Sequence, residues 1–255
     1  MLVYEEVKAN VCPDPIAVPD AVRNASFSVR VETTNLADGV YLLSGASHNS
    51  VAIEFNNFSA VFEAPLNEER SLAVIEEVRK LIPNKPIRFV INTNQHFDHA
   101  GGLRTYVHIG STVITHWKNF DFYNHDFINY VPRTLKPDMV SMWPPTELAE
   151  GYYYETVREN YVLSDDTRNL NIYYVNPLQK VEGMLMAYLP KEKLLLEADL
   201  VDTTEPLPAA LSRDQQSFLN AVRILKLDPA RIVPVHGKPI PWVDFAKIAG
   251  GNKPN

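Results

Sequence analysis

Short apolar runs separated by turn-forming residues fill the first quarter of the chain. Between about residues 26 and 63, β-branched and aromatic side chains gather in four runs, at 27–31, 40–43, 51–55 and 60–62. Turn formers such as Asp38-Gly39 and Asn56-Asn57 separate these runs, a pattern that is typical of short strands. From residue 67 to 82, the apolar positions instead recur at three- and four-residue steps. That period predicts an amphipathic helix, which Pro83 ends.

The same succession of strands and then a helix returns along the rest of the chain. We expect a short helix at 102–107 and strands at 88–92, 112–115, 171–175, 184–189, 193–197 and 231–235. A long helix begins at Ser212-Arg-Asp-Gln215, which has the form of a capping box, and its apolar face runs to Leu225. Two similar halves of strands and helices favour an α/β sandwich. We therefore expect one domain over 26–255, after an irregular, proline-punctuated lead at 1–25.

An aromatic-rich segment without regular periodicity lies between the two halves, over residues 117–155. It includes Trp117, Tyr123, Trp143 and Tyr152. Such a segment either packs as a layer over the core or forms a lid or substrate wall, because pockets and cores use the same residues. Both interpretations stay open at this point.

The composition narrows the possible partners and the compartment. The chain has 255 residues, 45% of them hydrophobic, and a net charge of -7. This acidity argues against nucleic acid or an anionic membrane as the main partner, and no apolar run approaches the roughly 20 residues that span a bilayer. The N-terminus lacks a signal-peptide pattern, so we expect a soluble protein, either cytoplasmic or secreted with its signal peptide removed. Cys12 is the only cysteine, which excludes an intrachain disulfide and a cysteine-rich metal site.

Chemistry-bearing residues gather where the expected strands end. Residues 94–102, Asn-Gln-His-Phe-Asp-His-Ala-Gly-Gly, follow the strand at 88–92 and hold two imidazoles and a carboxylate within four positions. Imidazole and carboxylate are ligands that zinc and similar metals prefer. Lys180 precedes one later strand, while Asp199 and His236 follow two others. Ligands converge at strand ends that share one edge of a sheet.

These motifs resemble the metallo-β-lactamase-fold superfamily of hydrolases. The metal loop of that family, H-x-H-x-D-H-x-G-G, matches residues 94–102 except at Asn94, which stands where the first histidine would be. The family's bridging aspartate matches Asp199 in Leu196-Glu-Ala-Asp199, and its last histidine matches His236 in Val233-Pro-Val-His-Gly237. The resemblance spans about residues 36–245 and implies a four-layer αββα sandwich.

The resemblance implies one complete and one incomplete metal site. Members usually hold two metals bridged by an aspartate and a hydroxide. In this chain one site is complete, with Asp98, His99 and His236 as ligands and Asp199 alongside. The other site keeps only His96, because no histidine occurs between 126 and 235. The alignment puts Lys180 at the position of the missing third histidine, with Gln179 or Asn176 as less favoured occupants.

The two replacements predict one tightly bound metal. An asparagine amide oxygen is neutral and a poorer zinc ligand than imidazole, and a protonated lysine cannot ligate. The expected cofactor is one zinc ion, with two ions or iron left open. Asp98 or Asp199 would orient a water or accept its proton, and Lys180 would stabilise an oxyanion or bind a substrate carboxylate. His96 would then serve as a proton relay.

The function that follows is metal-assisted hydrolysis of a small-molecule ester, lactone or amide. Two alternatives are a catalytically impaired protein that keeps the pocket for binding, and an oxidative enzyme with a single iron. Three further residues are candidates for the surroundings of the metal. His48 and His116 are expected near the pocket mouth, and Glu63, at the end of a strand, is expected to support a ligand. Against these roles, a lone histidine is usually structural and a single lysine is usually a solvated surface charge.

Overall fold

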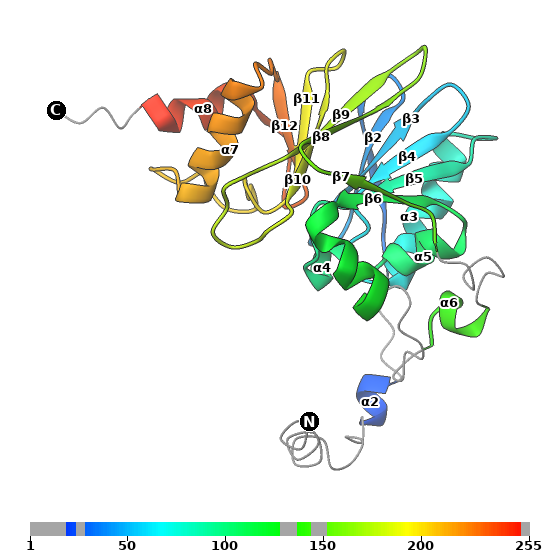
Figure 1. Ribbon diagram of the computed structural model, residues 1–255. Helices are drawn as coiled ribbons and strands as arrows, with labels where there is room; N and C mark the ends of the chain where they lie inside the picture. The colour runs from blue at the N-terminus through cyan, green and yellow to red at the C-terminus, as the bar shows by residue number, and fades with distance from the viewer. Residues whose placement is uncertain (1–18, 24–28, 128–136, 144–151, 251–255) are drawn as a thin grey trace.

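Two β-sheets pack face to face between two layers of helices. The computed structural model describes residues 19–23, 29–127, 137–143 and 152–250. In Figure 1, α3 and α5 cover the outer face of one sheet, and α7 and α8 cover the outer face of the other. This is the order of layers in the expected αββα sandwich, so the predicted fold class is confirmed. The boundary between a lead at 1–25 and one domain at 26–255 stays a prediction.

The first half of the described chain forms a seven-stranded sheet. Its strands are β1 (Glu32–Ala37), β2 (Val40–Ser44), β3 (Ser50–Glu54), β4 (Ser59–Phe62), β5 (Ile87–Ile91), β6 (Thr112–His116) and β7 (Tyr154–Val157). They lie in chain order, antiparallel from β1 to β4 and parallel from β4 to β7. The helices of this half are α3 (Glu68–Leu81), α4 (Phe97–Ala100), α5 (Leu103–His108) and α6 (Met139–Met142), with short helical turns at Trp117–Asn119 and Phe122–Phe127.

The second half of the described chain forms a six-stranded sheet in the order β13-β12-β11-β10-β9-β8. Its strands are β8 (Asn160–Ser164), β9 (Asn169–Tyr174), β10 (Leu185–Leu189), β11 (Leu194–Glu197), β12 (Arg231–Pro234) and β13 (Ile240–Pro241). Helix α7 (Arg213–Ile224) connects β11 to β12, which pair in parallel, and α8 (Trp242–Gly250) follows β13. The strands that carry Asp199 and His236 are therefore neighbours, and their following loops leave the same edge of the sheet.

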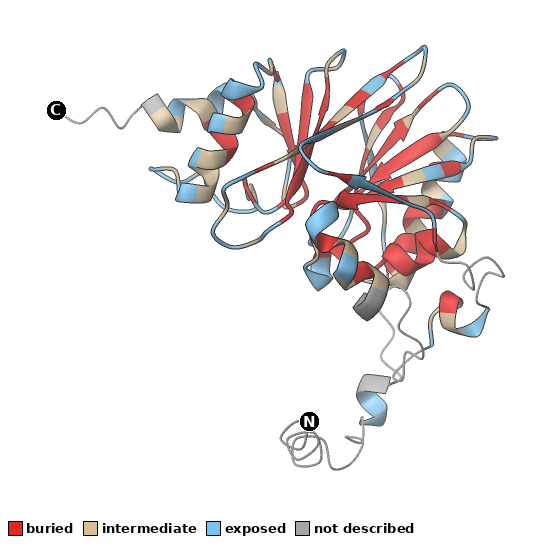
Figure 2. Cartoon of the chain, in the orientation of Figure 1, coloured by how far each residue is buried: buried red, intermediate tan, exposed pale blue. Residues whose placement is uncertain are grey.

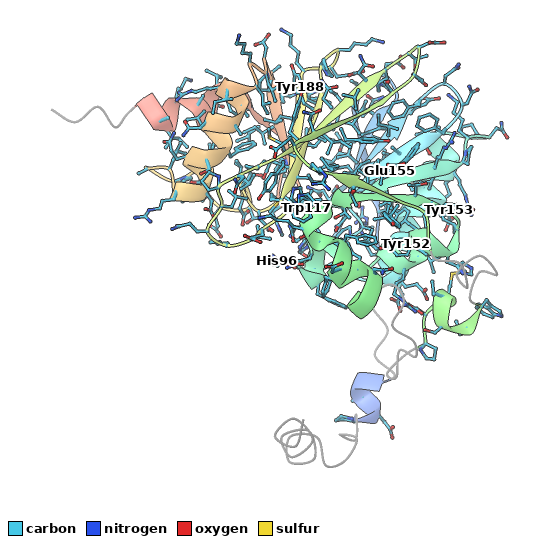
Figure 3. All side chains as sticks on the ribbon, viewed as in Figure 1. His96, Trp117, Tyr152, Tyr153, Glu155 and Tyr188 are labelled. Carbon is cyan, nitrogen blue, oxygen red and sulfur yellow. The ribbon has the colours of Figure 1, made fainter. Side chains whose placement is uncertain are left out.

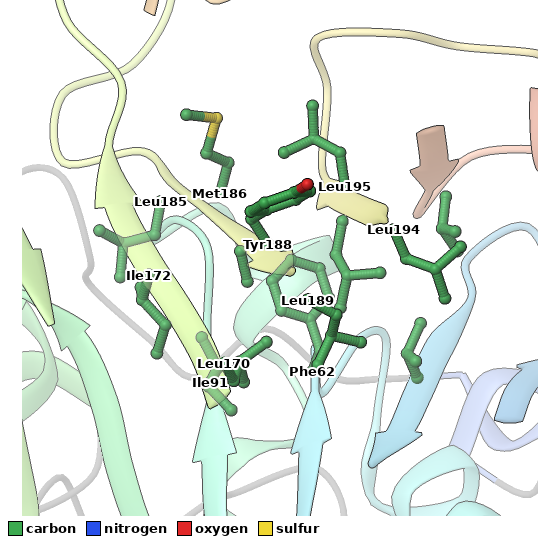
Figure 4. Packing of buried hydrophobic residues seen from close by; sticks show 14 of the residues in the cluster. Phe62, Ile91, Leu170, Ile172, Leu185, Met186, Tyr188, Leu189, Leu194 and Leu195 are labelled. Carbon is green, nitrogen blue, oxygen red and sulfur yellow. The ribbon is translucent and has the colours of Figure 1, made fainter. Parts of the chain in front are cut away.

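The hydrophobic core lies mainly between the two sheets. Phe62 and Ile91 of the first sheet belong to the same buried cluster as Leu170, Leu185 and Leu189 of the second (Figure 4). A second cluster packs α3 and α5 onto the outer face of the first sheet. Figure 2 shows the result: the inner strands of both sheets are mostly buried, and exposed residues gather on edge strands, on the outer sides of the helices and on loops. Both sheets are thus held rigidly relative to each other, which fixes the distances between loops at the sheet edges.

Most expected elements are present, and the differences have a common physical cause. The capping box Ser212–Gln215 is formed and opens α7 as predicted. The expected strand at 27–31 is wrong in its described part, because residues 29–31 are not in a strand and β1 begins at Glu32. Four of the six side chains of β1 are exposed, so this strand has no apolar alternation to reveal it.

Two further expectations fall partly outside the described residues. In the N-terminal lead, residues 20–23 form a helical turn, α2 (Asp20–Arg23), rather than irregular chain. Cys12, and Tyr130 of the aromatic segment, lie outside the described residues. In the part of the chain that the structure describes, no helix is both long and apolar enough to cross a membrane.

Candidate metal centre

The polar residues of interest lie in loops that follow four strands, β2, β5, β11 and β12. In Figure 3, His96 marks one end of the two sheets, and Tyr188 marks the opposite end. The loop after β5 is fixed by close backbone packing: a Cβ on Gly101 would lie 2.0 Å from the carbonyl oxygen of Leu66. Glycine is therefore required there, and it allows the loop to lie against the start of α3.

Three histidines from different loops form a compact cluster. His48 follows β2, His99 follows β5, and His236 follows β12, and one potential ligand atom of each lies within 4.8 Å of the others. The ring centroids are 4.2 Å apart for His48 and His236, 5.1 Å for His48 and His99, and 5.3 Å for His99 and His236. Two of these rings come from the first half of the molecule and one comes from the second.

Glu63 fixes the orientation of the His99 ring. Its Oε2 lies 2.6 Å from His99 Nδ1, and both side chains are fully buried. Glu63 also accepts hydrogen bonds from the Thr93 backbone N–H, the Thr93 hydroxyl and the Asn92 amide. In metal sites, a histidine that binds the ion through one ring nitrogen usually donates its other ring N–H to a carboxylate. The position of Glu63 therefore suits the supporting role that the sequence indicates.

Asp199 lies at the centre of the donors. Its Oδ1 is 3.1 Å from His99 Nε2 and 3.2 Å from His236 Nε2, and its Oδ2 accepts a hydrogen bond of 3.1 Å from the Asn94 amide. Burial alone would raise the pKa of Asp199, but the bonds from His236 and His99 hold it well below its usual range. Burial likewise opposes protonation of His99, yet its bonds to Asp199 and Glu63 raise the pKa of His99 to about 10. Without a metal, the centre is thus an ion pair between imidazolium and carboxylate.

Asn94 does not point an oxygen into this centre. Its Oδ1 accepts the His96 backbone N–H at 2.9 Å, and its amide nitrogen faces Asp199 and also lies 3.8 Å from Met184 Sδ. An amide N–H is a donor and cannot ligate a cation. Asn94 therefore binds Asp199 through its amide and offers no ligand atom to a metal.

The two remaining candidate ligands of the loop after β5, His96 and Asp98, are exposed. His96 Nδ1 lies 3.8 Å from Asp199 Oδ2, and Asp98 Oδ2 lies 3.5 Å from His48 Nε2. Both can therefore reach the centre from its solvent side. The structure brings together His96, Asp98, His99, Asp199 and His236, the five residues that the sequence indicates as metal ligands.

His48 corrects an expectation. The sequence places it at the pocket mouth, whereas the structure buries it inside the cluster with only 6% of its surface exposed. Burial, together with the positive charges of His236 and His99, lowers the pKa of His48 to about 4. The ring is therefore a neutral imidazole at physiological pH, the form that binds metals.

Lys180 lines the cavity beside the centre, whereas His116 does not. Lys180 lines an open cavity of about 340 Å³ together with His96, Asp199 and His236. It is exposed, and among the described residues it makes no hydrogen bond or ion pair, so its ammonium group faces the cavity without a protein partner. His116 is buried against Tyr174, with Nε2 bonded to the Arg158 carbonyl, and does not line this cavity.

Two residues near the centre escape the sequence reasoning. The Asn49 side chain donates to the carbonyls of Pro234 and Gly237, which flank His236. Arg70 is fully buried in α3 and donates to the carbonyl of Leu43, at the end of β2, at 2.8 Å and to that of His48, in the following loop, at 3.5 Å. A signal for Arg70 exists, because it lies four residues before Val74 on the buried face of the helix.

The aromatic segment contributes at least one supporting side chain. The Tyr123 hydroxyl donates to the Asn94 carbonyl at 2.9 Å and also contacts the Asn92 side chain. The ring is fully buried, which favours the core interpretation for this residue. Trp117 is nearly half exposed, with Arg158 over its ring, so this part of the segment faces solvent.

The donor set fits a borderline divalent metal. Three imidazoles, of which His48 is neutral, and two reachable carboxylates are the ligands of zinc sites. Zinc–nitrogen bonds of about 2.0–2.1 Å place two nitrogens roughly 3.4 Å apart, so histidine atoms within 4.8 Å of one another need to close by at most about 1.4 Å.

Comparison with known proteins agrees with this geometry. The family model "Metallo-beta-lactamase superfamily" matches residues 43–179, more than half of the chain. The chain belongs to the metallo-beta-lactamase superfamily.

Solved structures with the same fold share little sequence with this chain. A metallo-beta-lactamase from Pontibacter korlensis has a TM-score of 0.65 at 12% identity, covering 88% of this chain and 100% of that one. A metallo-beta-lactamase from Hirschia baltica gives 0.59 at 17% identity, with 88% and 99% covered. The metallo-beta-lactamase FIM-1 from Pseudomonas aeruginosa, in a mono-zinc form, gives 0.59 at 16% identity, with 88% and 95% covered. At these identities the similarity establishes the fold.

Proposed function

We propose that the protein is a metal-dependent hydrolase that acts on a small ester, lactone or amide. The observation that carries this proposal is the cluster of His48, His99 and His236 around Asp199, at the wall of an open cavity. A cavity of about 340 Å³ has room for a small molecule. Membership of the superfamily makes hydrolysis the reaction class with most support.

One metal ion, with zinc as the favoured element, fits the centre better than two. The position that would complete a second site is occupied by the Asn94 amide, which donates to Asp199. Lys180, on the same side of the cavity, adds a positive charge that disfavours a second cation. The mono-zinc form of FIM-1 is an example of this fold with one zinc.

The residues around the cavity have distinct tasks in this reaction. A bound zinc ion lowers the pKa of water and polarises a carbonyl group. Asp199 is ionised and oriented by Asn94, so it can accept a proton from water at the cavity wall. His96 is exposed beside Asp199 and can pass that proton to solvent. Lys180 reaches into the same cavity and can stabilise a developing oxyanion or hold a substrate carboxylate.

A non-catalytic binding protein is the second candidate, and one observation favours it. The charge of Asp199 is already satisfied by two imidazoles and an amide of the protein itself. The carboxylate of Asp199 therefore needs no metal ion as a partner, which is what a site that has lost catalysis would show.

The test is turnover by the metal-loaded protein. The purified chain is stripped with chelator, reloaded with zinc, manganese or iron, and assayed against esters, lactones and β-lactams, with Asp199→Asn as the matched variant. The proposal expects zinc-dependent hydrolysis of at least one class, reduced at least about 100-fold in Asp199→Asn. No turnover with any metal would favour the binding protein, and oxygen uptake with iron would indicate oxidative chemistry.

A further inference from the structure

We infer that His48 is a metal ligand, so that the centre is a three-imidazole site made by His48, His99 and His236. This inference rests on the proposed function only in requiring that the protein binds a metal. It differs from the ligand set that the sequence motif implies, in which Asp98, His99 and His236 hold the ion. The loop after β2, outside that motif, would supply the third nitrogen.

The free nitrogen of His48 carries the argument. Its Nδ1 lies 2.8 Å from the Ser47 hydroxyl, which can accept a hydrogen bond from it, and Nε2 is then the nitrogen with a lone pair for the cluster. Among the described residues, Nε2 has no hydrogen-bond partner, although the side chain is almost fully buried. The exposed Asp98 carboxylate is the nearest acceptor, at 3.5 Å, which is longer than an ordinary N–H···O hydrogen bond. A buried, unpaired imidazole nitrogen is costly, and a metal would satisfy it.

The other two rings present the matching nitrogens. His99 has Nδ1 bonded to Glu63, so its Nε2 is the atom that faces the cluster. His236 also directs its Nε2 toward Asp199. A metal ion bound by these two nitrogens would replace Asp199 as their partner, and Asp199 would then be available as a further ligand.

The loop that carries His48 is positioned from two sides. The Asn49 backbone N–H donates to the Val235 carbonyl at 2.8 Å, while its side chain donates to Pro234 and Gly237. On the side of α3, Arg70 donates to the Leu43 and Ser44 carbonyls at the end of β2 and, at 3.5 Å, to the carbonyl of His48 itself. These contacts hold His48 beside His236 before any metal arrives, which reduces the ordering cost of binding.

This arrangement also accounts for the imidazoles missing elsewhere. Asn94 uses its amide to bind Asp199, and Lys180 stays in the open cavity. The side of the centre near His96 therefore has too few ligands to hold an ion. The side near Asp98 gains one ligand, His48. His48 brings the number of imidazoles around one ion back to three, the number found in some catalytic zinc sites.

The test compares metal binding by the wild-type chain, His48→Gln and a matched control, His108→Gln, at the end of α5. Metal-free protein is titrated with Co²⁺, whose visible spectrum reports ligand number, and with Zn²⁺ in competition with a chromophoric chelator. We expect His48→Gln to lower affinity at least about 100-fold, since even supporting residues cost 10–100-fold, and to change the Co²⁺ spectrum. His108→Gln should match the wild type in both.

X-ray absorption of the zinc-loaded wild type provides a measurement that needs no variant. Three imidazoles around zinc support the inference, and two overturn it. Unchanged affinity and spectrum in His48→Gln would also overturn it, whether or not the protein hydrolyses esters. Conversely, a three-imidazole site in a protein without turnover would leave this inference intact and remove the proposed hydrolase. Absence of metal binding by the wild type would overturn both.

Discussion

Glu63 shows how one buried carboxylate sets the chemistry of a neighbouring histidine. It reaches His99 Nδ1 at 2.6 Å, and three hydrogen bonds from Asn92 and Thr93 keep its oxygens in place. Its backbone has a φ of 72°, a conformation that costs energy outside glycine. The surrounding contacts therefore maintain a strained residue whose side chain aims a ring at the centre.

Replacing Glu63 by glutamine tests this positioning role. The amide keeps the size of the side chain but removes the charge that orients and polarises His99. We expect Zn²⁺ affinity to fall about 10–100-fold, measured by competition with a chelator. Glu76→Gln, on the exposed face of α3, is the control and should bind zinc like the wild type. Equal affinities in the two variants would show that Glu63 serves stability alone.

At the level of single residues, the sequence indicates the loop after β5, Asp199 and His236, and the structure brings them together. These residues could be predicted because apolar runs show where strands end, and the ends of neighbouring strands lie at one edge of the sheet. The central place of His48 could not be inferred in the same way. Its ring is positioned by hydrogen bonds from Asn49 to residues almost 190 positions away, and no local pattern encodes such a contact.

The loops after β2 and β12 behave as one unit because Asn49 joins them. Its side chain is buried and spans two carbonyls of the turn that carries His236. The connection crosses from the first sheet to the second, so it sets the 4.2 Å separation of the His48 and His236 rings.

Asn49→Ala should therefore affect both stability and metal binding. One buried and one partly buried carbonyl lose their donor, which we expect to lower the free energy of unfolding by about 1–3 kcal/mol. Urea unfolding of the metal-free protein measures this change, and a zinc titration should show weaker binding because the two rings separate. Asn220→Ala, on the exposed face of α7, is the control. Weakened stability with unchanged zinc affinity would contradict the positioning role.

Helices α5 and α6 are joined by a buried ion pair that gives a distinct pH dependence. Asp138 caps α6 and accepts hydrogen bonds from Arg104, one of them at 2.9 Å. Burial alone would raise the pKa of Asp138, but its bonds from Arg104 and Ser141 lower it to about 2. The unfolded chain binds this proton more readily than the folded chain, so the stabilisation is present above about pH 4 and declines as the pH falls toward 2.

Asp138→Asn should remove this contribution. At pH 6 we expect the variant to lose about 1.5–3 kcal/mol of unfolding free energy, as for a hydrogen bond to a charged group. The difference from the wild type should shrink between pH 5 and pH 3, because Asp138 of the unfolded wild type then takes up a proton while that of the folded chain stays ionised. Urea unfolding of both proteins at pH 6, 5 and 3 measures this difference in unfolding free energy. A difference independent of pH would show that the charge of Asp138 contributes nothing.

Regular elements follow the sequence pattern wherever one face is buried. Strands of the core, such as β10 and β11, are buried at every position and are found where apolar runs predict them. Strands β7 and β8 are mostly exposed and escape prediction, because their stability comes from pairing with a neighbour rather than from their own side chains. The fold class was therefore predictable, whereas the edges of the sheets were not.

The whole molecule joins two half-structures, and the proposed metal would crosslink them. His48 and His99 belong to the first half and His236 to the second, so an ion bound by all three resists separation of the sheets. An ion that binds only the folded state stabilises it by about 2.7 kcal/mol when the free ion is present at 100 times its dissociation constant.

We expect zinc at that concentration to raise the urea midpoint of the wild type accordingly. His236→Gln, which removes the only cluster histidine contributed by the second half, should lose most of this gain while its metal-free midpoint stays close to that of the wild type. If zinc stabilised His236→Gln as much as the wild type at equal concentration, the ion would be held within one half, and the metal would not connect the two sheets.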